Sequence, residues 1–258
     1  MRLQGKSALV SGGSQGIGAA IATAFAAEGA SVLVTARSTG KLGAVANAIR
    51  ASGGTVETLA RDLTEPDAAS AAVAASVAAF GALDIVAHSA GATKYGDFFD
   101  LTDRDFEDGF ALKYYGAVRL ARAAWPHLMR TRGRILNVIG VGARVTDKNF
   151  AIGGSVNSAL TNFTKAMADR GVTDGVQVNA IHPGPVLTPR IQQRVDFIKK
   201  ERGIGQTQAM AEMEAQWRVS RLGRPEDIAA LATFIVSDAG DLLQGSVIDM
   251  DGGATRAI

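Results

Sequence analysis

Ser11-Gly12-Gly13-Ser14-Gln15-Gly16-Ile17-Gly18 stands at the first junction between a strand and a helix in this chain of 258 residues. Its glycines let the backbone turn sharply and approach a pyrophosphate closely, and the helix that follows offers free N–H groups at its positive end. An ordinary tight turn is the alternative. Because the loop opens a βαβ pattern, we favour nucleotide binding. The helix predicted after it has one apolar face, made of Ile17, Ala20, Ile21, Ala24 and Phe25.

Short apolar runs rich in β-branched residues alternate with helical patterns along the rest of the chain. This alternation predicts βαβ units, and nearly continuous apolar strands predict a parallel sheet covered on both faces. No linker or internal repeat interrupts the pattern. We therefore expect one domain over residues 1–258: a Rossmann-type, doubly wound α/β fold with about seven parallel strands and helices on both faces. The predicted strands are Ser7–Ser11, Ser31–Ala36, Val56–Ala60, Asp84–His88, Arg134–Ile139, Val176–His182 and Ser246–Met250.

A charged helical segment, 188–220, departs from this rhythm between the sixth and seventh predicted strands. Ligands of open α/β sheets bind beyond the carboxyl ends of the strands, so we interpret the segment as a substrate lid. Its apolar residues would suit a small or medium apolar ligand; ordinary packing of the lid helices against the rest of the domain is the alternative. These residues are Val186, Leu187, Ile191, Val195, Phe197, Ile198 and Met210.

Composition narrows the classes of partner. The chain has no cysteine, and its three histidines are far apart, so we expect neither disulfides nor a metal site. The 27 basic and 25 acidic residues are interspersed, which argues against a nucleic-acid surface. No signal peptide is evident, and no apolar run approaches the roughly 20 residues that span a bilayer. We expect a cytoplasmic protein with a small-molecule substrate, no nucleic-acid partner and no membrane partner.

Several motifs in the same order make the chain resemble the short-chain dehydrogenase/reductase family over nearly its whole length. The glycine loop matches T-G-x-x-x-G-x-G with Ser11 in place of threonine, and His88-Ser89-Ala90-Gly91 stands where the family has Asn-Asn-Ala-Gly. The segments 179–185, 221–228 and 251–253 resemble later family motifs. The resemblance implies an oxidoreductase with a nicotinamide cofactor. The residues it implies for cofactor binding are Gly12, Ser14, Gln15, Gly16, Ile17, Gly18, Asp62, Leu63, Ser89, Ala90, Gly91, Asn157, Pro183, Gly184, Val186 and Thr188.

The end of the second predicted strand, Val34-Thr35-Ala36-Arg37-Ser38, bears on the choice of cofactor. Relatives that prefer NAD carry an aspartate where this chain has Ala36, and that carboxylate would repel a 2′-phosphate. Arg37 has a guanidinium suited to phosphate recognition, and Ser38 follows it. A solvent-facing arginine is the alternative. We expect NADP(H), with Arg37 and Ser38 among the cofactor-binding residues.

The catalytic residues of the family are missing. The resemblance implies a serine after the fifth strand, a Tyr-x-x-x-Lys pair on the next helix and an asparagine on the preceding long helix. Alignment through 158–160 and 164–168 places the serine position at Gly140, the tyrosine position at Gly153 and the lysine position at Asn157. Lys113 stands at the asparagine position. All four positions therefore depart from the family pattern.

Three side chains are candidate substitutes for the missing groups. Lys113 could extend its ammonium into volume vacated at Gly153 and Asn157, or turn to solvent as a surface lysine. Ser155 could act near the vacant tyrosine position, or cap a helix. His88 could act at the end of the fourth strand, or fill a hydrogen-bonded structural role.

Two functions of different classes remain open at this stage. The first is an NADP(H)-dependent oxidoreductase with an atypical active site, acting on a small or medium carbonyl or hydroxyl compound. The second is a catalytically inactive NADP(H)-binding regulator or scaffold on the same fold. Non-redox chemistry, such as that of a lyase or isomerase, is a third possibility on this fold. Apolar residues on the two long helices, including Trp125, Leu160 and Phe163, together with the family resemblance, predict a homotetramer, with a dimer as the fallback.

Overall fold

Seven parallel strands form one sheet in the computed structural model, which describes residues 1–256. The strand order is β3-β2-β1-β4-β5-β6-β7, and every neighbouring pair is parallel. This confirms the expected sheet, and the predicted strand ends differ from the observed ones by at most one residue. The strands are β1 (Ser7–Ser11), β2 (Ser31–Ala36), β3 (Thr55–Ala60), β4 (Ile85–His88), β5 (Arg134–Val138), β6 (Gln177–Pro183) and β7 (Val247–Met250).

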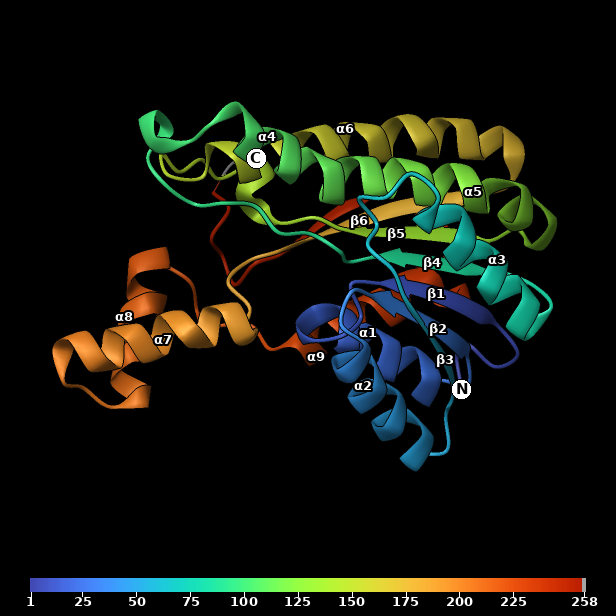
Figure 1. Cartoon of the computed structure of the whole chain (residues 1–258), viewed down its shortest axis with the longest axis horizontal. Helices are drawn as coiled ribbons and strands as arrows, with labels where there is room; N and C mark the ends of the chain where they lie inside the picture. Colours follow the sequence, from blue (N-terminus) through green and yellow to red (C-terminus); the bar gives the residue numbers. More distant parts are fainter. Residues whose placement is uncertain (257–258) are drawn as a thin grey trace.

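Helices cover both faces of the sheet, as Figure 1 shows. One layer contains α1 (Gly16–Ala27), α2 (Thr39–Ala51) and α9 (Pro225–Val236). The other contains α3 (Ala68–Phe80), α5 (Gly116–Thr131) and α6 (Ala151–Asp174). Each layer buries its apolar stripe against the strands, and this burial supplies most of the stabilising free energy, at about 1.5–3 kcal/mol for a fully buried large side chain. Phe25 and Leu120, one from each layer, are both fully buried.

The strand order reverses between β1 and its neighbour β4, so the connections leave this point in opposite directions. In open α/β sheets, ligands bind outside the carboxyl ends of the strands at such a switch point. Ser11 at the end of β1 is paired with His88 at the end of β4. The loops after β4, β5 and β6 leave the sheet along the same edge.

A π-helical turn interrupts the long helix that follows β4. α4 (Asp103–Phe110) begins with a capping box between Thr102 and Asp105 and runs into the π-helical segment η2 (Ala111–Tyr115), from which α5 continues. A π turn breaks the regular i→i−4 ladder, and such turns are frequent at functional sites. Lys113 lies in the middle of this segment.

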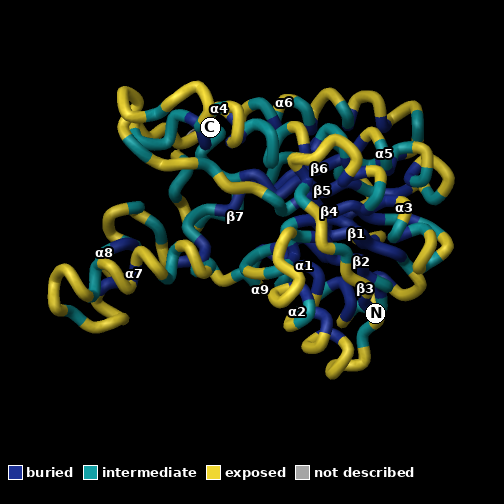
Figure 2. The backbone as a smooth tube through the Cα atoms, viewed as in Figure 1, coloured by how far each residue is buried: buried dark blue, intermediate teal, exposed yellow. Residues whose placement is uncertain are grey.

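The predicted lid contains two helices, α7 (Pro189–Arg202) and α8 (Gln206–Trp217), which project from the sheet edge in Figure 1. Val195, Ala209 and Met213 form a small core between them with Leu222, and Leu187, Ile191, Ile198 and Met210 pack against it. Figure 2 shows this buried patch inside an otherwise largely exposed lid. Neither a ligand-facing surface nor packing against the domain describes most of these residues, because the two lid helices pack on each other. Val186 belongs to the main core, and Phe197 is exposed.

Candidate active site

The glycine loop keeps the start of α1 open. Gln15 is the N-cap of α1 but makes no side-chain cap; its Oε1 accepts a hydrogen bond from Lys41 Nζ at 2.7 Å. A Cβ on Gly12 would lie 2.7 Å from the backbone of Ala90, and a Cβ on Gly18 would overlap the Gly12 carbonyl oxygen. The loop thus depends on close backbone approach, and the first N–H groups of α1 have no side-chain cap. This cradle fits the pyrophosphate of a dinucleotide.

Cations gather at the end of β2, where the adenosine end of a dinucleotide would lie. The Arg37 side chain is 71% exposed and lies 3.9 Å from Asp62. Ser38 caps α2 by accepting a hydrogen bond from the backbone N–H of Lys41. The ammonium of Lys41 is a second cation here that the sequence reasoning missed. Its position in the first turn of α2, one turn after Arg37, was the available signal.

The remaining predicted cofactor residues lie along the same edge. Ser89 N donates to Ser11 O at 3.2 Å, which ties the loop after β4 to β1. Leu63 is buried beneath Gly116. On the far side, Gly184 packs against Asp251, Val186 bridges Gly223, and Thr188 lies beside Gly16 as the N-cap of α7. The fold therefore brings the segments that follow β1, β3, β4, β6 and β7 to one edge of the sheet.

Lys113 extends its side chain to the lysine position of the family. Its stem passes Gly91, where a Cβ would lie 2.9 Å from Lys113 Cδ. Its ammonium donates to Asn157 Oδ1 at 2.6 Å and to the carbonyl oxygen of Ile139. Burial, and secondly the charge of Arg190, lower the pKa of Lys113 to about 8. Lys113 is thus a partly buried amine whose lowered pKa lets it hold or release a proton near neutral pH.

His88 is enclosed between β1 and η2. Its Nδ1 lies 2.8 Å from Ser11 Oγ and its Nε2 lies 3.1 Å from the Lys113 carbonyl oxygen. Because a carbonyl can only accept, Nε2 carries the proton and Nδ1 accepts from the serine hydroxyl. Burial lowers the pKa of His88 to about 4. Both ring nitrogens are engaged by protein groups, so the geometry favours the structural alternative for His88.

The volume at the tyrosine position is filled, which corrects the expectation of a large vacancy there. A Cβ on Gly153 would overlap the ring of Phe150, and a Cβ on Gly142 would lie 2.7 Å from the same ring. The two glycines therefore form a cradle for an aromatic side chain that the sequence reasoning missed. Gly140, at the serine position, has φ +140, which a serine would adopt only with strain. Its carbonyl accepts a long hydrogen bond from Asn157 Nδ2, 3.4 Å.

Ser155 does not join this cluster. It is exposed in the second turn of α6, whose N-cap is Phe150, so Ser155 is not the cap either. At 3.6 residues per turn, two residues rotate the side chain by about 200° from Gly153. Ser155 therefore lies on the opposite side of α6 from Gly153 and Asn157, and its candidacy as a catalytic residue is wrong for that geometric reason.

Two loops are tied together over the Phe150 ring. Tyr95, in the loop after β4, lies with its ring centroid 6.0 Å from that of Phe150. Its hydroxyl donates to Asp147 Oδ2 at 2.7 Å, and this bond raises the pKa of Tyr95. Gly96 N donates to Asn149 O at 2.9 Å. These contacts join residues about 50 positions apart in the sequence, and no local sequence pattern predicts them. A tyrosine whose hydroxyl donates to a carboxylate is a poor proton donor to a substrate. We therefore interpret Tyr95 as a structural residue beside the site.

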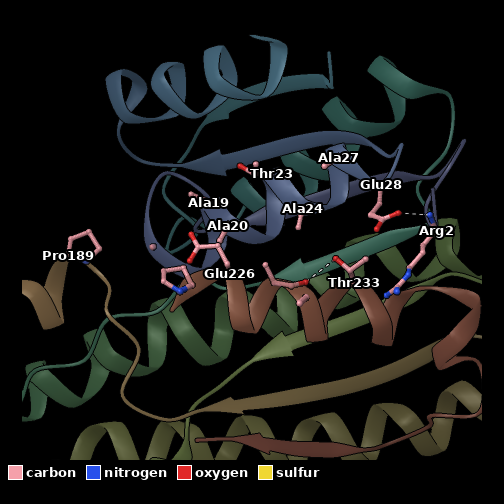
Figure 3. A pocket seen from close by; sticks show the side chains of 14 residues that line it. Arg2, Ala19, Ala20, Thr23, Ala24, Ala27, Glu28, Pro189, Glu226 and Thr233 are labelled. Atoms are coloured by element: carbon pink, nitrogen blue, oxygen red, sulfur yellow. Dashed lines mark hydrogen bonds between the residues drawn. The ribbon is translucent and has the colours of Figure 1, made fainter. Parts of the chain in front are cut away.

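A separate hollow of about 760 Å³ lies on the outer layer between α1 and α9, as Figure 3 shows. Alanines make up much of its lining, and Glu28 at one end is bound to the backbone N–H of Arg2 at 2.7 Å. None of the candidate catalytic side chains lines it.

Within residues 1–256, no helix has both the length and the apolar character needed to cross a bilayer.

The chain matches a family model over residues 12–255, described as enoyl-(acyl carrier protein) reductase. It is 36% identical over 256 residues to an uncharacterized oxidoreductase of Mycobacterium tuberculosis, covering 98% of this chain and 94% of that protein. It is 30% identical over 253 residues to D-beta-hydroxybutyrate dehydrogenase of Cupriavidus necator, covering 97% and 98%. Both relatives thus span nearly the same length as this chain.

A solved structure is similar over the whole chain. L-sorbose reductase from Gluconobacter frateurii, complexed with NADPH and L-sorbose, has a TM-score of 0.95 at 28% identity and covers 100% of both chains. A short-chain dehydrogenase from Burkholderia cenocepacia in complex with NADP has a TM-score of 0.84 at 31% identity, covering 98% of this chain and 99% of that one.

Proposed function

The chain belongs to the short-chain dehydrogenase/reductase family of NAD(P)-dependent oxidoreductases, and on that premise we propose that it is an NADP(H)-dependent member that reduces the carbonyl group of a small or medium compound with Lys113 as the proton donor. The observation that carries the proposal is the ammonium of Lys113, held 2.6 Å from Asn157 Oδ1 at the lysine position of the family. The four substituted positions then mark a rebuilt site.

The preference for NADP(H) rests on charge at the end of β2. Ala36 places no carboxylate there to repel a 2′-phosphate, and the exposed guanidinium of Arg37 and the ammonium of Lys41 supply two cations. When bound, the reduced cofactor would supply the hydride. NADPH and NADP complexes of the Gluconobacter and Burkholderia proteins are compatible with this preference.

The chemistry of Lys113 follows from its hydrogen bonds. An ammonium has three N–H groups, and within residues 1–256 two of them have acceptors, Asn157 Oδ1 and the Ile139 carbonyl. The third is left for a substrate oxygen. As the carbonyl carbon is reduced, the π pair moves to the oxygen, which takes the proton and leaves a neutral amine. A pKa of about 8 keeps the donor protonated at neutral pH and still able to give up its proton.

The test follows NADPH absorbance with a panel of carbonyl compounds. We expect Lys113→Met to lower kcat/KM by about 10²–10⁴, the usual contribution of a general acid, while NADPH still binds. In the wild type, carbonyl reduction should fall as the pH rises through about 8, because the ammonium loses its proton there; this limb should vanish in Lys113→Met. Lys165→Met, an exposed lysine on α6, is the control.

Two outcomes would contradict this proposal. If NADPH binds and no panel member is reduced, the non-catalytic NADP(H)-binding alternative replaces it. If Lys113→Met turns over as the wild type does, Lys113 is not the proton donor.

For assembly we propose a homotetramer, with a dimer as the fallback, formed through α5 and α6. The structure changes which side chains can serve this pairing: Leu160 is fully buried within the subunit, and the indole N–H of Trp125 donates to Asp174 at 2.8 Å. Met129 and Val172 remain as exposed apolar residues on the two helices. Light scattering at micromolar concentration tests this, and a monomer would contradict it.

A further inference from the structure

The lid does not offer the apolar surface that its composition suggested. Apart from the exposed Phe197, its apolar residues are used mainly in the core between α7 and α8. The first two turns of α7 instead carry Arg190 and Arg194, both exposed and one turn apart. Within residues 1–256 neither guanidinium has an ion-pair partner; Arg194 lies over the ring of Trp217, 5.8 Å from its centroid. The lid therefore brings unpaired positive charge to the site.

A third arginine stands on the loop after β5. Arg144 follows the short helix η3 (Val141–Ala143), which runs beside α6 at Ser158. Its Nε lies 3.4 Å from Asp249 Oδ2 on β7, and the side chain is 37% exposed. Asp249 Oδ1 in turn lies 3.1 Å from Nδ1 of the fully buried His182. The Asp249 carboxylate thus holds the Arg144 guanidinium by an ion pair. Within residues 1–256 the guanidinium makes no side-chain hydrogen bond, so its N–H groups remain available.

Arg144 lies close to the Lys113 ammonium: a Cβ on Gly142, two residues before Arg144, would lie 3.1 Å from Asn157 Nδ2, and Asn157 Oδ1 accepts a hydrogen bond from Lys113. Effects on neighbouring pKa values agree with this placement and add the lid arginines. The charge of Arg190 contributes to lowering the pKa of Lys113. The charges of Arg144 and Lys113 act to lower the pKa of His182, although its burial is the larger cause. Arg194 acts in the same direction on the pKa of Asp147 across the site. The cations Arg144, Arg190, Arg194 and Lys113 outnumber the carboxylates of Asp147 and Asp249 among these groups, and an excess of positive charge concentrates anionic ligands.

Building on the proposed function, we propose that the carbonyl substrate carries an anionic group, a carboxylate or a phosphate, and that Arg144 and Arg190 bind it. A guanidinium presents paired N–H groups that match either anion. Arg144 approaches from the loop after β5 and Arg190 from the lid, so an anion would be held between two separate elements. Such an anion would also favour the protonated form of Lys113, which keeps the proton donor charged while the substrate is bound.

The experiment compares matched pairs of compounds that differ in charge. NADPH consumption is followed with acetoacetate against its ethyl ester, and with dihydroxyacetone phosphate against dihydroxyacetone. We expect the anionic member of one pair to have the higher kcat/KM, and the pair that shows this distinguishes carboxylate from phosphate. Arg144→Gln and Arg190→Gln should each lower kcat/KM for that anion by about ten- to a hundredfold, the range for hydrogen bonds to charged groups, and should affect its neutral partner clearly less, so that the preference for the anion shrinks.

Two further variants guard the interpretation. Lys200→Gln removes an exposed cation almost three turns further along α7 and should leave the preference for the anion unchanged. Arg144→Lys retains the charge without the paired N–H groups, and should recover part of the loss if Arg144→Gln folds as the wild type does by circular dichroism. Equal or better turnover of the neutral members, or an unchanged preference in both glutamine variants, would overturn the inference. A weaker affinity of Arg190→Gln for NADPH, with the preference intact, would assign Arg190 to the cofactor and overturn its role here.

A binding measurement separates this inference from the proposed function. If none of the four compounds is reduced, the oxidoreductase proposal fails for them, and calorimetry then measures acetoacetate and dihydroxyacetone phosphate binding to the protein saturated with NADP⁺. Binding of one anion that is at least tenfold weaker in both glutamine variants would support the anion site. Absence of binding, or equal binding by wild type and variants, would overturn it.

Discussion

The glycine loop (Ser11–Gly18) and the corner around Lys113, Phe150 and Asn157 lie on the same edge of one sheet, but different atoms determine their shapes. In the loop, a Cβ on Gly12 or Gly18 would meet backbone atoms of Ala90 or of Gly12 itself. In the corner, a Cβ on Gly153 or Gly91 would meet side chains, the Phe150 ring and the Lys113 stem. Backbone atoms in a packed layer cannot move aside, whereas side chains can be exchanged. We therefore expect the loop to tolerate substitution less well than the corner.

Gly18→Ala tests the backbone side of this comparison and should have the largest effect. The added Cβ overlaps the Gly12 carbonyl oxygen and would lie 3.0 Å from Gly13 Cα, so the loop must shift away from α1. We expect a loss of about 2–4 kcal/mol in the free energy of unfolding, in the range of severe packing defects, together with weaker NADPH binding. Denaturant unfolding and nucleotide titration measure both.

Gly43→Ala is the matched control, because Gly43 lies in α2 with no atom within 4 Å of its added Cβ. It should stabilise the protein slightly, since alanine is favoured over glycine in helices by about 0.5–1 kcal/mol. Equal behaviour of the two variants would show that the close approach at Gly18 has no energetic weight.

Gly153→Tyr tests the corner, whose shape side chains determine. We expect a smaller loss in the free energy of unfolding, which the second substitution Phe150→Ala should relieve. Alone, Gly153→Tyr forces the new Cβ into the Phe150 ring, and overpacking of this kind destabilises by about 1–3 kcal/mol. In the Phe150→Ala background the same substitution should be milder, with a coupling of about 1 kcal/mol or more. A double-mutant cycle on the free energy of unfolding measures the coupling. Equal losses in the two backgrounds would mean that the ring does not occupy the tyrosine volume.

Arg37→Ala sharpens the comparison at the nucleotide end with the smallest effect. Removing the guanidinium should weaken NADPH binding by about fivefold, since one exposed hydrogen-bonded ion pair is worth about 1 kcal/mol, and leave NADH binding unchanged. Fluorescence titration of both nucleotides is the measurement. Arg104→Ala removes an exposed arginine on α4 and serves as the control. A parallel fall in affinity for both nucleotides, or no change for either, would contradict a role for Arg37 in selecting the phosphate.

The fold was predictable because its signals are local. Strand periodicity and the glycine loop lie within short windows, and the predicted strand ends differ from the observed ones by at most one residue. The arrangement of the site residues was harder to predict from the sequence. The expectation that Lys113 turns toward Asn157 came from counting along a family pattern, and the structure places the two groups 2.6 Å apart. Ser155 was misplaced because distance along a helix does not state which face a residue occupies.

Other features of the site arise only from tertiary packing. Phe150 fills the tyrosine volume because the loop before α6 folds back over Gly142 and Gly153, and nothing in the nearby sequence indicates this. The bond from Tyr95 to Asp147 joins two loops 52 positions apart. The apolar residues of the lid gave a correct helical pattern but not the partner they pack against, which is the second lid helix.

The hydrogen bonds around His88 have a consequence for alignment. Ser11 at the end of the glycine loop contacts His88, His88 contacts the Lys113 carbonyl, and the other end of Lys113 contacts Asn157. These contacts connect Lys113 to the glycine loop through a single intervening side chain, that of His88. A displacement of the glycine loop is therefore expected to move Lys113 as well. If the loop binds the nucleotide and Lys113 donates the proton, as proposed above, this connection would keep the cofactor and the proton donor aligned.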